Sequence, residues 1–229
     1  MDKNIPKAKQ LIQERKAFLF DFDGTLVNLD KLNVDSFKIL FKNEFNLEFT
    51  RDDFMQYISG RGSKDGIKIY LDKKGVKEYD IEQLGKEFSS KKKDLIENHL
   101  GEEVFLIPGI DTFLKYLSVH DKRMLVVTSS HYTYVKKILR HFGLFGYFEK
   151  VYDRGTVDKG KPSAEIFLQG IKYTGLENDE CIAFEDSLFG LKSAKGANLY
   201  TVGILNKGWN EDFVYDLADV VIEDYGQLI

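Results

Sequence analysis

Short apolar runs of strand length recur along this chain, separated by amphipathic stretches of helical period. The runs have the character of buried strands and are AFLF at 17–20, MLVVT at 124–128, CIAF at 181–184, LYTVGI at 199–204 and DVVI at 219–222. The clearest helical stretches between them cover residues 110–117, 135–142 and 164–173. Strands that alternate with helices predict an α/β protein whose parallel sheet is covered by helices on both faces.

One long segment breaks this alternation, because from about Leu29 to about Glu103 the patterns are helical and no convincing strand occurs. Apolar side chains there recur at i, i+3 and i+4, as on one face of a helix. We therefore predict a Rossmann-like, doubly wound α/β core formed by residues 1–28 and 104–229, with an all-helical domain inserted at 29–103. The lysine run 91–93 predicts a solvated helix face, since acidic residues flank it.

The composition of the chain favours a globular protein and argues against two classes of partner. The 229 residues are 43% hydrophobic and carry a formal net charge of −4, which gives no electrostatic case for nucleic acid or an anionic membrane. No apolar stretch has the length of a signal peptide or a membrane span. Cys181, the single cysteine, lies in an apolar run and is expected to be a reduced core thiol. We expect a cytoplasmic monomer or small homo-oligomer, in which Trp209 serves in packing.

Four short segments place polar or charged residues at or beyond the ends of predicted strands. These segments are DFDGT at 21–25, TSS at 128–130, GKP at 160–162 and EDS at 185–187. Ligands of open α/β sheets bind outside the carboxyl ends of the strands. We therefore expect the four segments to meet in one crevice.

The carboxylates of these segments suggest a magnesium site and a nucleophile. Asp21 and Asp23 are costly to place near each other unless a cation lies beside them. Mg²⁺ prefers oxygen ligands and keeps waters or a substrate phosphate in its shell, so Asp21, Asp186 and Glu185 could hold it. With the metal and Lys161 neutralising a phosphate, Asp21 could attack phosphorus. Asp23 could protonate the leaving alkoxide and later take a proton from water.

Smaller residues of the same segments could bind the phosphate. Gly24 lets the backbone approach it closely, and the Thr128 hydroxyl can donate a hydrogen bond to it. Thr25 and Ser129 are further candidates for binding the substrate. Ser129 and Ser130 also have a simpler interpretation as N-caps of the helix that follows, and we expect this role for at least one of them.

The order and spacing of the four segments resemble the motifs of the haloacid dehalogenase superfamily. The resemblance is to its branch of phosphatases and phosphomutases with a helical cap after the first motif, and it extends from about Ala17 to the C-terminus. It implies that Asp21 is the nucleophile and that Asp23 is the acid/base, whose backbone carbonyl also binds the metal.

The resemblance also implies roles for the remaining motif residues. Thr128 matches the residue that holds the phosphoryl group, and Lys161 matches the lysine that neutralises its charge. Asp186 matches a metal ligand and Glu185 its partner. The insert at 29–103 would then be a mobile cap that closes over a small phosphorylated metabolite.

Asp23 also helps to choose among the activities of this superfamily. Dehalogenases proper and phosphonatase-type members lack this aspartate, so an ester hydrolase or a phosphomutase is favoured. The β-phosphoglucomutase branch commonly has a histidine and a threonine where this chain has Asn33 and Leu29, which favours net hydrolysis and leaves the mutase as the alternative. A phosphate-binding regulatory protein on the same scaffold is a non-enzyme alternative, which the intact Asp23 disfavours.

The loop ISGRGSKDG at 58–66 occupies the cap position that reaches toward the substrate in this branch. Arg61, Ser63 and Lys64 could contact the leaving group or a second phosphate. A plain glycine-rich connection between two cap helices explains the same residues equally well.

Overall fold

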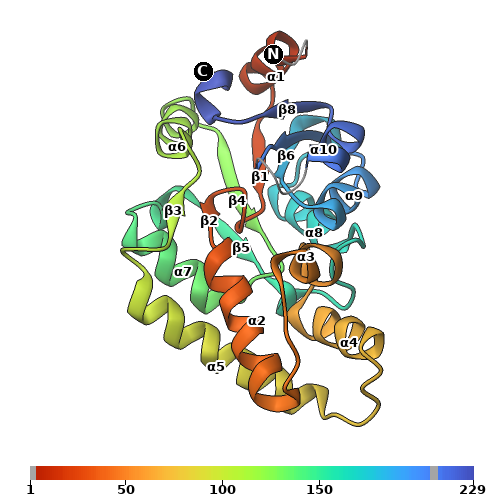
Figure 1. Ribbon diagram of the computed structural model, residues 1–229. Coiled ribbons are helices and arrows are strands. Elements are labelled where there is room, and N and C mark those ends of the chain that lie inside the picture. The colour runs from red at the N-terminus through yellow and green to blue at the C-terminus, as the bar shows by residue number, and fades with distance from the viewer. Residues whose placement is uncertain (1–3, 207–210) are drawn as a thin grey trace. The chain divides into compact units, whose positions relative to one another are not determined.

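The structure is a computed structural model that describes residues 4–206 and 211–229 (Figure 1). Trp209, which was expected to serve in packing, lies outside these residues. The chain divides into two compact units, which we call the core unit, Met1–Asn28 with Leu106–Ile229, and the helical unit, Leu29–Phe105.

A six-stranded parallel sheet runs through the core unit, in the order β5-β4-β1-β6-β7-β8. Its strands are β1 (Ala17–Phe20), β4 (Arg123–Val127), β5 (Lys150–Tyr152), β6 (Cys181–Glu185), β7 (Tyr200–Ile204) and β8 (Val220–Ile222). A separate two-stranded sheet is formed by β2 (Val27–Asn28) and β3 (Phe105–Leu106). Because β1 lies between β4 and β6, the residues that follow these three strands are neighbours at one edge of the sheet.

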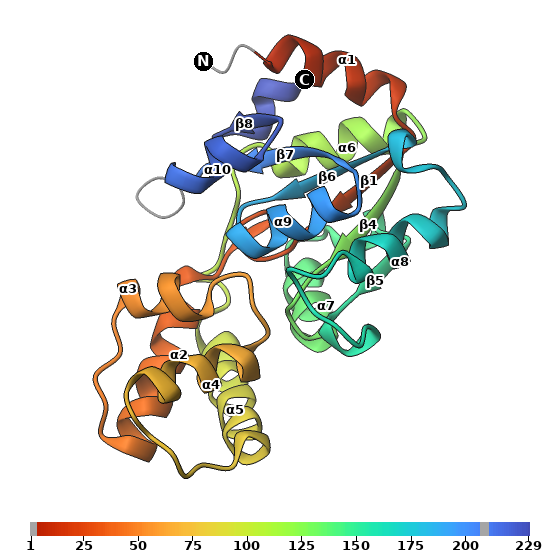
Figure 2. The ribbon, with the colours of Figure 1, turned by 90° about the vertical axis from the view of Figure 1, so that its right-hand side faces the viewer.

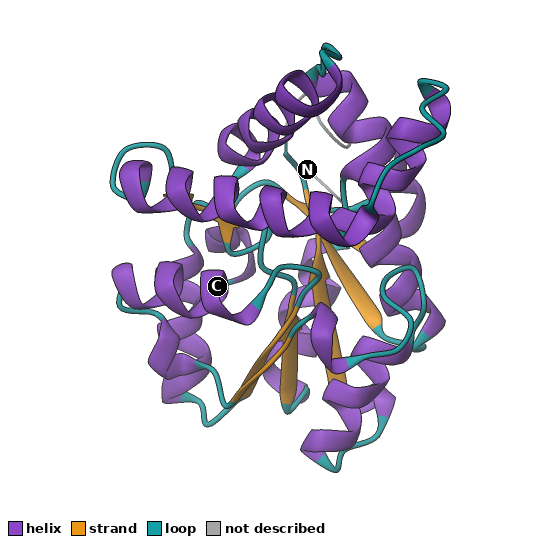
Figure 3. Ribbon diagram, turned by 90° about the horizontal axis from the view of Figure 1, so that it is seen from below, coloured by secondary structure: helices purple, strands orange, loops and turns teal. Residues whose placement is uncertain are grey.

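Helices cover both faces of the six-stranded sheet (Figures 2 and 3). One face carries α8 (Glu165–Thr174), α9 (Leu188–Gly196) and α10 (Glu211–Leu217), and the other carries α6 (Ile110–Val119) and α7 (Tyr132–His141). Helix α1 (Ile5–Glu14) contacts β8 and the C-terminal 3₁₀-helix η5 (Tyr225–Leu228). Further 3₁₀-turns are η2 (Phe145–Tyr147), η3 (Arg154–Thr156) and η4 (Asn178–Glu180).

The pleat of β1 explains why helices are needed on both sides. Successive side chains of a strand point to opposite faces. Leu19 belongs to a buried cluster with Phe167 of α8, whereas the Phe20 ring lies 6.4 Å from the Phe113 ring of α6. A strand that is apolar on both faces must be covered on both faces, so the predicted doubly wound α/β fold is confirmed.

The sequence patterns predicted five of the six strands of this sheet and missed β5. This strand is three residues long, lies at the edge of the sheet and begins with the exposed Lys150, so its apolar pattern is too short to detect. Helices α1, α9 and α10 were also missed.

The helical unit is built around aromatic side chains. Its elements are α2 (Asp30–Phe45), α3 (Arg51–Asp53), a π-helical turn η1 (Phe54–Ile58), α4 (Ser63–Lys73) and α5 (Ile81–His99). The Phe37 ring of α2 stacks on the Phe88 ring of α5 at 4.2 Å, and the Phe41 ring lies 4.3 Å from that of Tyr70 on α4. Phe37 and Phe41 are four residues apart on α2, which is the helical spacing expected from the sequence. Their contacts join α2 to α5 and to α4.

Two expectations about single residues have opposite outcomes. Cys181 is fully buried with a free thiol, as expected. The expectation that the lysine run is solvated is wrong for Lys92, which is buried because it lies on the same stripe of α5 as Phe88 and Ile96. Within the described residues, no helix is both long enough and apolar enough to cross a bilayer.

Candidate active site

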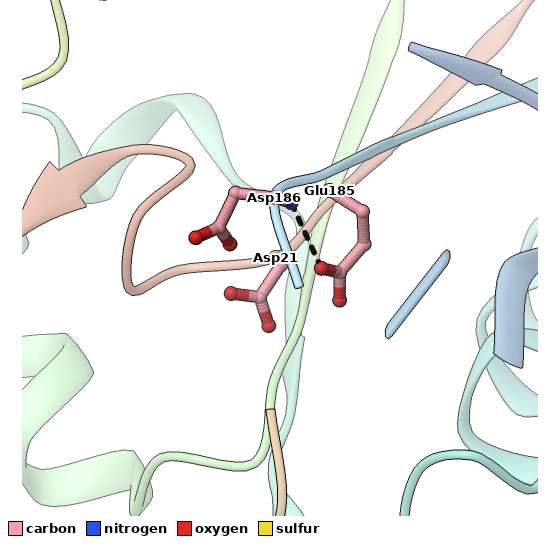
Figure 4. Close-up of side chains that lie close together, drawn as sticks. All are labelled: Asp21, Glu185 and Asp186. Atoms are coloured by element: carbon pink, nitrogen blue, oxygen red, sulfur yellow. Dashed lines mark hydrogen bonds between the residues drawn. The ribbon is translucent and has the colours of Figure 1, made fainter. Parts of the chain in front are cut away.

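Three of the four motif segments follow adjacent parallel strands in the core unit. Asp21 comes directly after β1, Thr128 directly after β4, and Asp186 directly after β6. Lys161 reaches the same edge from the loop between β5 and α8. The side chains of Asp21, Glu185 and Asp186 lie close together there (Figure 4).

Lys161 is the buried centre of this arrangement, with a side chain only 1% exposed. Its ammonium donates to Asp21 Oδ1 at 2.6 Å, to Glu185 Oε1 at 2.5 Å and to the Val127 carbonyl at 3.0 Å. An ammonium group has three hydrogens, so all of them are engaged. The three acceptors fix the position of the ammonium beside one oxygen of Asp21.

The charges of this cluster are strongly coupled. Burial by itself lowers the pKa of Lys161, but the carboxylates of Asp21 and Glu185 raise that pKa above its ordinary value, so the ammonium stays charged. Burial raises the pKa of Asp21 to about 7, and Glu185 and Asp23 add to this rise while Lys161 opposes it. Additional positive charge beside Asp21 would therefore favour its ionised form.

Glu185 is fully buried and has both oxygens occupied. Its Oε1 accepts from Lys161, and its Oε2 accepts from the backbone N–H groups of Asp186 and Ser187 and from the Ser187 hydroxyl, each at 3.0 Å. Figure 4 shows the bond from Asp186. A β-carbon on Gly190 would lie 1.8 Å from Oε1, so this carboxylate occupies space that only a glycine leaves open.

Asp186 is half-buried and is held on both oxygens. Its Oδ1 accepts from the Thr25 hydroxyl at 3.3 Å, and its Oδ2 accepts from the Asn206 amide at 3.1 Å. Gly24 has a φ of +82°, and a β-carbon on it would lie 2.0 Å from Asp186 Oδ2. The glycine is therefore required both by its backbone conformation and by this close approach.

The carboxylates fit a divalent cation. Asp21, Glu185 and Asp186 each offer an oxygen, and these oxygens all lie within 4.8 Å of one another. Carboxylate oxygens suit hard divalent ions such as Mg²⁺, Ca²⁺ or Mn²⁺. Four donors already occupy Glu185, so Asp21 and Asp186 have the greater remaining capacity to accept a metal.

Thr128 is oriented by the turn that follows β4. It is 1% exposed, and its Oγ1 accepts from the backbone N–H of Ser130 at 3.0 Å. Because the oxygen is used as an acceptor, the hydroxyl hydrogen is left to donate toward a ligand. Asp23, two residues beyond Asp21, is half-buried in the loop between β1 and β2.

The expectation that Ser129 or Ser130 caps the next helix is wrong. Helix α7 begins at Tyr132, and its N-cap is His131, whose Nδ1 accepts from the backbone N–H of Thr133 at 3.3 Å. Histidine is uncommon at this position, which is why the sequence favoured serine. Asp153 Oδ2 gives further support to this end of α7 by accepting from the Tyr132 N–H at 2.8 Å.

Sequence reasoning missed Asp153 and Asn206. Asp153 directly follows β5, which was itself missed, so no strand end drew attention to it. Asn206 comes two residues after β7. A polar residue just beyond a strand is the signal that identified the other segments, and it would also have found this amide.

The residues of the loop at 58–66 make their described contacts inside the helical unit. Arg61 donates to the Gln56 carbonyl at 3.2 Å, and Ser63 is the first residue of α4. Lys64 forms an ion pair with Glu82 of α5 at 2.5 Å. These contacts link η1, α4 and α5.

Comparison with known proteins gives one family and several relatives. The family model described as haloacid dehalogenase-like hydrolase matches residues 18–204. β-Phosphoglucomutase of Bacillus subtilis is 27% identical over 82% of this chain and 83% of its own length, and the phosphorylated carbohydrates phosphatase of Thermotoga maritima is 24% identical over 80% and 82%. A crystal structure of CbbY from Rhodobacter sphaeroides in complex with phosphate shares the fold, with a TM-score of 0.82, 23% identity and coverage of 93% and 96%.

Proposed function

This chain belongs to the family of haloacid dehalogenase-like hydrolases, and from that membership and the site geometry we propose that it is a magnesium-dependent phosphatase acting on a small phosphate monoester. The observation that carries the proposal is the pairing of Asp21 with the buried Lys161 beside the carboxylate of Asp186. A carboxylate flanked by a fixed ammonium and a second carboxylate suits attack on a dianionic phosphate, once a cation is bound.

In the first step an oxygen of Asp21 forms a bond to phosphorus, and the ester P–O bond breaks. Asp23 gives its proton to the departing alkoxide oxygen. Lys161 and the Thr128 hydroxyl stabilise negative charge on the transferred phosphoryl group. The product of this step is an aspartyl-phosphate on Asp21 and a free alcohol.

In the second step water attacks the phosphorus of the aspartyl-phosphate. Asp23, now ionised, accepts the proton of that water, and the bond between phosphorus and Asp21 breaks. Inorganic phosphate leaves, Asp21 recovers its carboxylate and Asp23 its proton. The two aspartates need opposite protonation states when the substrate binds, since one must attack and the other must donate.

Asp21, Asp186 and the backbone carbonyl of Asp23 would hold the magnesium ion, with Glu185 beside them. The ion supplies positive charge that offsets the repulsion between an anionic nucleophile and an anionic substrate. Asp186 is already held by Thr25 and Asn206, so its carboxylate is oriented before the ion arrives.

We propose that the helical unit, at about 29–103, is a cap that restricts which esters reach Asp21. Within the helical unit, the loop at 58–66 is the segment that we propose to contact the leaving group. The alternative activity, a phosphomutase, is supported by the β-phosphoglucomutase relative. Net hydrolysis is favoured because the two positions compared with that branch hold the apolar Leu29 and the amide of Asn33, neither of which transfers protons.

The test is release of inorganic phosphate from a panel of sugar phosphates, phosphoglycolate and nucleotide monophosphates, with and without Mg²⁺. We expect turnover that EDTA abolishes and that Asp21→Asn reduces by at least about 10³-fold, since it removes the nucleophile. Asp111→Asn, at an exposed position on α6, is the matched control and should retain wild-type rates. Conversion of β-glucose 1-phosphate to the 6-phosphate without phosphate release would instead establish the mutase. A stable aspartyl-phosphate without turnover would establish the phosphate-binding regulatory protein.

A further inference from the structure

Asn206 joins two parts of the candidate site that are far apart in the sequence. Its Nδ2 donates to the Gly24 carbonyl at 3.0 Å and to Asp186 Oδ2 at 3.1 Å. Gly24 belongs to the loop that carries Asp21 and Asp23, whereas Asp186 follows β6. An amide NH₂ group has two hydrogens, and here each one has an oxygen acceptor.

The acceptors also fix which end of the amide faces the site. A carbonyl and a carboxylate both accept hydrogen bonds, so an amide oxygen in this place would oppose two oxygens at about 3 Å. The orientation of Asn206 is therefore set by its neighbours. Its bond to Asp186 is of the charge-assisted kind, which is stronger than a bond between neutral groups.

Thr25 and Gly24, from the loop that carries Asp21, also lie against Asp186. The hydrogen bond from Thr25 to its other oxygen is long, at 3.3 Å. Gly24 presents no side chain, and its backbone runs close enough that an added β-carbon would lie 2.0 Å from Oδ2. The Gly24 carbonyl and Asp186 Oδ2 accept from the same Asn206 amide group, which therefore joins the loop to the carboxylate.

We propose that Asn206 is a positioning residue that holds the Asp186 carboxylate against the Asp21–Asp23 loop and thereby sets the affinity of the site for a divalent cation. The inference rests on the proposed function, because it takes Asp186 as a metal ligand. Asn206 acts through Asp186 and is not itself required to touch the cation or the substrate. Partners of this kind typically change metal affinity by about 10- to 100-fold when they are removed.

The test is Asn206→Leu, which keeps the branched shape and loses both donors. Binding of Mn²⁺, as a paramagnetic stand-in for Mg²⁺, is measured by electron paramagnetic resonance on protein without substrate. We expect the dissociation constant to rise at least about tenfold. The Mg²⁺ concentration that gives half-maximal activity should rise in parallel, with most of kcat recovered at saturating metal, because the catalytic groups remain in place.

Asn178→Leu is the matched control. The Asn178 amide also donates to a backbone carbonyl, that of Ala197 at 2.7 Å, but it lies in η4, before β6 begins. The Asn178→Leu variant should lose a similar hydrogen bond and keep the wild-type affinity for Mn²⁺. Asn206→Thr, which retains one hydroxyl donor, should fall between wild type and Asn206→Leu and serves as the second variant should the leucine variant fail to fold.

The outcomes separate this inference from the proposed function. Wild-type affinity for Mn²⁺ in folded Asn206→Leu or Asn206→Thr would overturn the positioning role while leaving the phosphatase proposal intact. An equal loss of affinity in Asn178→Leu would also overturn it, since the effect would then be one of general stability. Absence of Mn²⁺ binding by the wild-type protein, or Mn²⁺ binding that Asp186→Asn leaves unchanged, would overturn both.

Discussion

At the scale of single residues, the two acidic groups bonded to Lys161 have different amounts of freedom. Glu185 is fully enclosed and accepts four hydrogen bonds. Asp21 is bonded to Lys161 through one oxygen, and its side chain is 10% exposed. Glu185 thus fixes the lysine, while the second oxygen of Asp21 is the one suited to attack phosphorus or bind metal.

Removing Lys161 tests how much this charge pairing contributes. In Lys161→Met the carboxylates of Asp21 and Glu185 stay buried and lose their counter-ion, which typically costs about 3–5 kcal/mol of unfolding free energy. The loss should depend on pH, because without the ammonium the pKa of Asp21 rises further above its already raised value of about 7. When the pKa of a carboxyl is higher in the folded than in the unfolded state, the unfolding free energy of the protein falls as pH rises. The reason is that the unfolded state releases the proton at a lower pH than the folded state does.

Urea denaturation of the EDTA-treated proteins at pH 5 and pH 8 measures this effect. Lys161→Met should be closer to wild type at pH 5 and much less stable at pH 8. Lys115→Met, at an exposed position on α6, should match wild type at both values. An equal loss of unfolding free energy at both pH values would contradict this prediction. It would show that Lys161 stabilises the protein mainly through the packing of its side chain and not through its charge.

The residues that could be predicted from the sequence are those that carry charge at a strand end. Asp21, Lys161 and Asp186 were expected to meet because parallel strands end at the same edge, and the structure brings them together. The position of Asn206 just beyond β7 could be predicted in the same way, but its hydrogen-bond partners and the capping role of His131 could not. Both depend on which backbone groups come within hydrogen-bond distance, and local sequence does not contain that information.

At the scale of elements, the start of α9 and the end of β6 are built around one carboxylate. Ser187 is the N-cap of α9, and its hydroxyl accepts from the Gly190 N–H while donating to Glu185. The first turn of a helix favours a negative charge, so Glu185 is stabilised by α9 as well as by Lys161. The position of Glu185 also explains why residue 190, in the first turn of α9, is a glycine. The carboxylate occupies the space that a side chain at this position would need.

Gly190→Ala tests that dependence. Within a helix, alanine is usually better than glycine by about 1 kcal/mol. Here the new methyl group would lie 1.8 Å from Glu185 Oε1, so overpacking should win and lower the unfolding free energy by about 1–3 kcal/mol. Activity should fall as well, because displacement of Glu185 moves its partner Lys161.

Gly146→Ala in η2 is the control for this substitution. A β-carbon there would have no atom of the described residues within 4 Å, so the substitution should change the unfolding free energy by no more than about 0.5 kcal/mol. An unchanged or increased stability of Gly190→Ala would mean that Glu185 can move aside without consequence, which contradicts the packing described for α9.

Elements differed in how well the sequence predicted them. β6 was predicted from its apolar residues, whereas β5, with its exposed first residue at the sheet edge, was not. In the insert, the helical pattern expected from the sequence is observed in α2, Asp30–Phe45, because its apolar residues repeat along one face of the helix. Short edge elements are defined by pairing with their neighbours, and that pairing is tertiary information.

At the scale of the whole molecule, the two ends of the chain lie outside the residues matched by the family model and contact each other. The match covers 18–204, whereas α1 precedes it and η5 follows it. Helix α1 contacts both β8 and η5, and Figure 1 shows the two ends side by side. The Lys9 ammonium also donates to the backbone oxygen of Ile229 at 2.6 Å. The contact therefore joins the first helix to the last strand of the sheet.

Ile12→Ala tests whether this contact stabilises the sheet without affecting the chemistry. Ile12 is 1% exposed on α1, and loss of a buried isoleucine side chain typically costs about 2–5 kcal/mol. The urea concentration at the unfolding midpoint should therefore fall. Because α1 contributes no residue to the Asp21–Lys161–Asp186 cluster, kcat/KM measured where the variant is folded should stay within about twofold of the wild-type value. Val119→Ala, 67% exposed at the end of α6, should change neither quantity. If Ile12→Ala lowered kcat/KM at a temperature where the protein is still folded, the end-to-end contact would have to influence the site through β8 and η5, where Tyr225 donates to the Thr25 carbonyl at 3.1 Å.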